Sequence, residues 1–173
     1  MELFIALVVI LQTFSISLGV GSSTLAIVNF FVAIADGKID PTERKMMGIV
    51  YVVLRVAMVA IFVTTILLVA NDLSKNGFLT TFDYAELIPL FVLFTNASLM
   101  TLKIMPSTFG PSIQAGSWYT LGTLAGLEIV GFTEFQLMHF ILAYITWIVL
   151  ATGITNGIMA IMREKFEQSK KTA

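Results

Sequence analysis

The sequence contains no cysteine and only one histidine, and each scarcity excludes a class of function. Without cysteine, the chain by itself cannot form disulfides, iron–sulfur clusters, thiolate metal sites or thiol redox centres. The single histidine, His139, cannot supply both axial ligands of a bis-histidine haem. No P-loop, zinc-protease, Rossmann or G-x-S-x-G motif occurs either. We therefore expect no metal, no other cofactor and no enzymatic activity.

Charge is also scarce, because only 12% of the 173 residues are charged and the formal net charge is -1. This balance gives no argument for binding nucleic acid. Hydrophobic residues make up 57% of the chain, more than an ordinary soluble domain carries. Runs of roughly 18 or more residues are almost uncharged, which is long enough to cross a bilayer as a helix. The lipid bilayer is thus the first expected partner.

The apolar runs predict an all-α integral membrane protein built as a bundle of five transmembrane helices. The expected helices cover residues 3–35, 41–70, 85–105, 117–132 and 134–166. They form one transmembrane domain, 1–166, followed by a short cytoplasmic tail, 167–173. The first helix is about 50 Å long against a hydrocarbon core of about 30 Å. We therefore expect it to tilt, or to kink in the serine- and glycine-rich stretch 15–23.

The connections have recognisable turn chemistry. The sequence DGKIDPTE resembles the second half of an EF-hand loop, but Val32 and Ile34 stand where the first carboxylates should be. A turn explains it better, with Gly37 as a C-cap and with Asp40 and Glu43 forming a capping box. Polar residues 71–84, with a turn at Asn76 and Gly77, and irregular residues 105–116 are the other long connections expected. Pro89 is expected in the first turn of its helix.

Small residues recur at four-residue spacing, which lets neighbouring helices approach closely. The groups are Ser15, Gly19 and Ser23; Gly122 and Gly126; and Gly153 and Gly157. Trp118 and Tyr119 are expected at a membrane–water interface, where aromatic side chains gather.

Basic residues predict the orientation in a cell membrane. In a five-span arrangement only Lys75 lies on one side, and Arg55 falls within the membrane. The residues on the other side are Lys38, Arg44, Lys45, Lys103, Arg163, Lys165, Lys170 and Lys171. Because basic residues concentrate in cytoplasmic loops, we expect a multi-pass protein with its N-terminus outside and its C-terminus in the cytoplasm.

Arg55 is the first candidate site residue. It follows Lys45 by ten residues, which places it about 15 Å deep along the helix. A charge at that depth is costly and usually faces the bundle interior with a partner. The alternative is an arginine that reaches back toward the interface.

Three asparagines form the second candidate site. Asn29, Asn96 and Asn156 each precede a charged residue by seven positions, so parallel helices would hold them at one depth. They could simply join helices through hydrogen bonds of about 0.6–2 kcal/mol. Alternatively, with Arg55, they line a polar constriction that favours small anions.

Glu128 and His139 form a third candidate, a proton relay. They flank Thr133 at similar separations, so a hairpin there would bring them to one depth. A membrane carboxyl is easily kept neutral and histidine titrates near physiological pH. The alternative is a buried hydrogen-bonded pair.

Two functions compete. The first is a permease or channel subunit for a small polar or anionic solute, proton-linked through Glu128 and His139, which assembles as a homo-oligomer or with other membrane subunits. The second is a non-catalytic accessory or scaffold subunit of a larger membrane complex, in which the same polar residues join helices.

Overall fold

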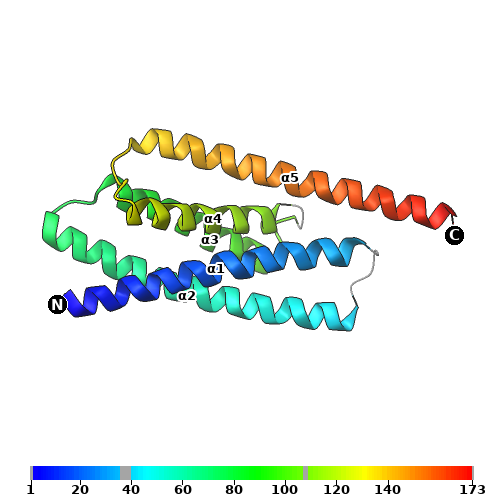
Figure 1. Cartoon of the computed structure of the whole chain (residues 1–173), viewed down its shortest axis with the longest axis horizontal. Coiled ribbons are helices and arrows are strands. Elements are labelled where there is room, and N and C mark those ends of the chain that lie inside the picture. The colour runs from blue at the N-terminus through cyan, green and yellow to red at the C-terminus, as the bar shows by residue number, and fades with distance from the viewer. Residues whose placement is uncertain (1, 36–39, 107–108, 173) are drawn as a thin grey trace.

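The computed structural model describes residues 2–35, 40–106 and 109–172, and within these ranges it has helices and no strand. Helix accounts for 88% of it. The helices are α1 (Glu2–Ala35), α2 (Pro41–Asn76), α3 (Thr81–Thr101), α4 (Gly110–Ile129) and α5 (Leu137–Thr172). Successive helices run in alternating directions, so the two ends of the chain lie at opposite ends of an elongated bundle (Figure 1). The expected all-α architecture with five helices is confirmed.

The helices fall into two length classes. α3 and α4 have 21 and 20 residues and are about 30 Å long, close to one hydrocarbon thickness. α1, α2 and α5 have 34, 36 and 36 residues and exceed about 50 Å. The α1–α2 hairpin and the second half of α5 therefore extend beyond α3 and α4 at one end of the bundle (Figure 1).

Capping residues set the helix boundaries. Asp40 accepts a hydrogen bond from the Glu43 backbone N–H at 2.7 Å and returns one from its own N–H to the Glu43 carboxylate at 2.9 Å. Pro41 follows in the first turn of α2, so the expected capping box is confirmed. The proposed C-cap Gly37 lies outside the described residues. At the other end of α2, Gly77 adopts a left-handed φ of 75°, which confirms the expected turn.

Several predicted boundaries were wrong. α2 continues through polar residues to Asn76, and α3 begins at Thr81 because Thr80 and Asp83 form a second capping box. Pro89 consequently lies inside α3 instead of in its first turn. α4 starts at Gly110, so most of the expected irregular segment 105–116 is helix. Capping explains the boundary at the start of α3, whereas α4 begins after Phe109 without a side-chain cap.

α1 is one continuous helix through the serine- and glycine-rich stretch where a kink was expected. Its hydroxyls bond back to carbonyls one turn earlier: Ser15 to Leu11 at 2.7 Å and Thr24 to Val20 at 2.7 Å, with similar bonds from Thr13, Ser17 and Ser22. These hydroxyl groups make their hydrogen bonds to the backbone of α1 itself. The stretch can therefore be polar without breaking the helix.

Four of the described helices contain segments long and apolar enough to cross a membrane: Glu2–Phe31, Pro41–Asn76, Thr81–Thr101 and Leu137–Met162. α4 does not meet the same criterion, although its length matches that of α3. It contacts α1, α3 and α5, and most of its first four turns is buried. The glycine and serine residues in the first half of α4, namely Gly110, Ser112, Gly116 and Ser117, are buried.

Polar and apolar side chains are distributed as lipid solvation would require. Large apolar side chains such as Phe4, Val52, Phe91 and Val149 are exposed. Buried polar side chains are nearly as numerous as buried apolar ones: Gln12, Ser15, Ser22, Ser23, Thr64, Thr65, Asp83, Glu86, Asn96, Ser112, Gln114, Ser117 and Thr155. A water-soluble bundle would show the opposite preference. The pattern is consistent with a membrane protein.

α1 and α4 pack tightly where Gly19 faces Trp118. A Cβ atom added at Gly19 would lie 2.2 Å from carbons of the Trp118 ring. Trp118 is completely buried, so its expected place at a membrane–water interface was wrong. Ser15 and Ser23 are buried beside Gly19, which confirms the small-residue packing face on α1.

The other glycine pairs behave differently from one another. A Cβ at Gly122 would lie 3.2 Å from Val20, so this position also packs against α1. Gly126, Gly153 and Gly157 have no atoms within 4 Å of an added Cβ in the described residues. Close packing is thus confirmed at Gly122 alone, and the α5 pair faces outward.

We predict that Gly19→Ala destabilises the bundle by about 1–3 kcal/mol, because the new methyl group overlaps the Trp118 ring. The matched control is Gly21→Ala, where nothing lies within 4 Å and alanine is the better helix former. Loss of helical circular dichroism on heating in detergent measures both. Equal unfolding temperatures for the two variants would contradict the packing.

Candidate functional site

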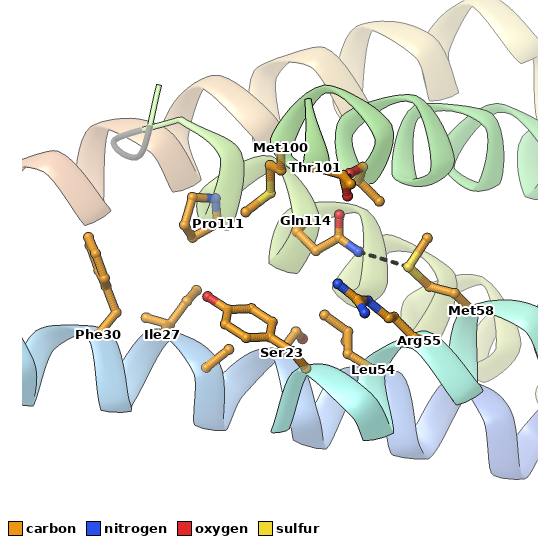
Figure 2. Close-up of a pocket in the computed structure, with 13 residues that line it drawn as sticks. Ser23, Ile27, Phe30, Leu54, Arg55, Met58, Met100, Thr101, Pro111 and Gln114 are labelled. Atoms are coloured by element: carbon orange, nitrogen blue, oxygen red, sulfur yellow. Dashed lines mark hydrogen bonds between the residues drawn. The ribbon is translucent and has the colours of Figure 1, made fainter. Parts of the chain in front are cut away.

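A cavity of about 220 Å³ lies where α1, α2, α3 and α4 meet. It is lined by Ser23, Ala26, Ile27, Phe30, Tyr51, Leu54, Arg55, Met58, Ala97, Met100, Thr101, Pro111 and Gln114. Figure 2 shows α1 and α2 forming one wall, with side chains from the ends of α3 and α4 opposite. Apolar groups dominate, and polar groups enter from each of the four helices.

Arg55 brings the only charge among the described residues that line this cavity. Its guanidinium extends from α2 into the space between Leu54 and Gln114 (Figure 2). Within the described chain it makes no ion pair or hydrogen bond. An arginine in an apolar segment normally has a partner, and the expected one is absent from the part of the chain that the structure describes.

Arg55 is exposed, and four neutral polar residues line the cavity with it. Ser23 of α1, Tyr51 of α2, Thr101 of α3 and Gln114 of α4 also line the cavity, and none of them carries a negative charge at neutral pH. Hydroxyl and amide groups can donate hydrogen bonds to an anion. Ser23 and Thr101 already donate to the carbonyls of Val20 and Ala97, so the Tyr51 hydroxyl and the second N–H of Gln114 are the neutral donors left beside the positive charge.

Asn96 holds one wall of the cavity in place. Its Nδ2 donates to the Gly110 carbonyl at 2.9 Å and to Gln114 Oε1 at 3.0 Å. Gln114 Nε2 in turn points to Met58 Sδ at 3.4 Å (Figure 2). Asn96 is only 2% exposed, and its Oδ1 has no hydrogen-bond partner in the described residues. It orients Gln114 across the α3–α4 interface.

The three asparagines do not form a common layer. Asn29 and Asn156 are half-buried, and the structure gives neither of them a hydrogen bond. The described backbones of α1 and α3 do not approach each other closely, and no described hydrogen bond joins Asn29 to Asn96. Of the three, Asn96 is the one joined to the cavity. Residues at equal depth on parallel helices need not contact one another, because each helix can turn a different face toward its neighbours.

Glu128 and His139 are also not brought together. Glu128 lies in the last turn of α4 and His139 in the first turn of α5, and both are exposed. No described hydrogen bond or ion pair joins them. His139 lines a separate cavity of about 440 Å³ between α4 and α5, together with Phe135, Phe140 and Tyr144. The relay between these two residues thus has no geometric support.

The structure adds an acidic residue that sequence reasoning missed. Glu86 lies in the second turn of α3 and is 8% exposed. Its side chain lies near that of Gln12 on α1. The sequence predicts a helix that begins at residue 85, which would place Glu86 at the end of that helix and not inside it. The T-x-x-D capping pattern at Thr80 and Asp83 was the available signal that the helix begins earlier.

Comparisons of the chain with protein-family models, with curated proteins and with solved structures find no match.

We predict that Asn96→Leu lowers the free energy of unfolding by about 1–3 kcal/mol, because it removes the donor that satisfies Gly110 and Gln114. Asn156→Leu is the matched control, since no hydrogen bond is described for it, and a change within about 0.5 kcal/mol is expected. Unfolding titrations in mixed detergent measure both variants. Similar losses of unfolding free energy in the two variants would contradict this assignment and support a common layer of asparagines.

Proposed function

We propose that this protein is a small membrane permease or channel subunit that binds a small anion beside Arg55. The observation that carries the proposal is the guanidinium in a 220 Å³ cavity without a described counter-charge. Arg55 is an exposed charge within an apolar segment, and an anion bound in the cavity would compensate that charge. The planar fork of arginine fits a carboxylate or phosphate group with two hydrogen bonds.

The residues that line the cavity indicate which class of solute it would favour. Ile27, Phe30, Leu54 and Met58 provide apolar surface, while Arg55 supplies the only described charge. Such a cavity favours a small organic anion, such as a short monocarboxylate, over a strongly hydrated multivalent ion. The carboxylate would bind Arg55 and the organic body would lie against the apolar wall.

The cavity is closed on one side by the apolar core, which supports a permease over an open channel. That core comprises Ile16, Leu54, Ala57, Met58, Ile61, Leu90, Leu93, Trp118 and Leu121. On α1, α3 and α4 these residues lie displaced from the cavity toward the end where the chain begins, whereas on α2 Leu54 and Met58 also line it. The solute site would thus reach one face of the membrane at a time.

We further propose that α4 is the fifth membrane crossing. Its 20 residues are sufficient at about 1.5 Å each, and it runs antiparallel to α3 and α5. Its polar residues Ser112, Gln114 and Ser117 are buried against protein, so this part of α4 does not need the hydropathy of a lipid-facing helix. The basic residues then place the C-terminus in the cytoplasm, the N-terminus outside and the cavity nearer the cytoplasmic face.

We predict that Arg55→Leu abolishes uptake of radiolabelled short monocarboxylates into proteoliposomes. Loss of a charged hydrogen-bonding partner typically weakens binding by about 2–5 kcal/mol. Arg55→Lys should retain part of the uptake, because it keeps the charge and loses the fork geometry. The matched control is Lys75→Leu, which removes an exposed basic residue remote from the cavity. Full uptake by Arg55→Leu, or none by the parent protein, would reject the function.

An accessory role is the second candidate, and the position of α5 favours it. Only 6% of the apolar window of α5 is buried, compared with 28–33% for α1, α2 and α3. Gly153 and Gly157 are exposed on this helix, with room for a helix from another copy or another subunit.

We predict for this second candidate that Gly153→Leu dissociates any complex isolated in mild detergent, because a large side chain blocks close helix approach. The matched control is Gly21→Leu on α1, where an added Cβ also meets no atom within 4 Å. Size-exclusion chromatography with light scattering gives the stoichiometry. A monomeric parent protein, or a complex unaffected by Gly153→Leu, would exclude this role for the α5 face.

A further inference from the structure

Glu86 is a buried carboxyl in a segment apolar enough to span a membrane. It lies near the opposite end of α3 from the cavity residue Thr101. Gln12 of α1 approaches it and also donates to Thr65 Oγ1 of α2 at 3.3 Å. Three helices therefore meet around this one carboxyl.

The charged groups described as acting on Glu86 are all carboxyls. They are Asp83 on its own helix, Asp72 on α2 and Glu128 on α4, while α1 contributes the neutral Gln12. No ion pair with a basic residue is described for Glu86. The described residues also contain no group of three carboxyl or imidazole side chains placed to hold a metal ion. A proton is the remaining simple means of neutralising it.

We propose that Glu86 is a proton-binding site of this protein. A buried carboxylate without a cation is unfavourable, so the neutral acid is the form that suits the folded bundle. The neighbouring amide of Gln12 can serve both states, since it offers N–H donors to the carboxylate and a carbonyl acceptor to the acid. Binding converts the carboxylate and a hydronium ion into the acid and water, and release reverses this.

The proton site and the anion cavity lie on opposite sides of the apolar core. Gln12 and Ser23 mark the two levels on α1, about 16 Å apart at the helical rise per residue. Coupling of the two, as symport of a proton with an anion, rests on the proposed function. The proton site itself does not, because it depends only on the surroundings of Glu86.

Modification by dicyclohexylcarbodiimide tests the site, because this lipid-soluble reagent reacts with protonated carboxyls in apolar surroundings. The parent protein in liposomes is treated across a range of pH, digested and mapped by mass spectrometry. We expect an adduct on Glu86 that is lost as the medium becomes alkaline. No adduct on Glu86 at any pH, or one that does not change with pH, would overturn the proposal.

Two variants complete the test. Glu86→Gln should lose this adduct, whereas the matched control Glu134→Gln, at an exposed position outside the helices, should keep it. Because the adduct is mapped in the parent protein, the result does not depend on how well Glu86→Gln folds. Arg55→Leu separates the two proposals, since it should lose anion uptake while Glu86 remains modified. Loss of the Glu86 adduct in folded Arg55→Leu would contradict an independent proton site.

Discussion

The contact between the Trp118 ring and the bare backbone of Gly19 determines where α4 lies. An indole can approach α1 this closely only because glycine has no side chain there. With α4 held against α1, its polar residues turn toward the neighbouring helices: Gln114 toward Asn96 on α3, and Ser117 toward Tyr144 on α5 at 2.8 Å. The wall of the Arg55 cavity therefore depends on a contact that carries no polar group at all.

Some of this architecture could be predicted from the sequence because it depends on local chemistry. Long apolar runs predict helices in any solvent that lacks hydrogen-bonding partners, and capping residues such as Asp40 and Glu43 act on their own turn. Arg55 stood out for a similar reason, since a charge within an apolar run is conspicuous wherever its helix packs. These inferences needed no knowledge of neighbouring helices.

The remaining features depend on which helix faces which. Trp118 and Tyr119 are adjacent and equally suited to an interface, yet one is fully buried and the other is only partly buried. Asn96 resembles Asn29 and Asn156 in sequence, and only its contact with α4 distinguishes it. The burial of Glu86 likewise arises from the approach of Gln12, which lies far away in the chain. Periodicity and spacing cannot predict such tertiary contacts.

The hydroxyl groups along α1 have a mechanical consequence. Because Thr13, Ser15 and Ser17 bond to carbonyls of their own helix, they move with α1 as a unit. Its described hydrogen bonds to other helices are few, chiefly Gln12 with Thr65 and Thr24 with Tyr119. Packing, more than hydrogen bonding, therefore fixes the rotation of α1 about its long axis, because a turn that moved Gly19 away would bring a side chain against the Trp118 ring. The stretch that looks most polar in the sequence thus contributes little polar contact between helices.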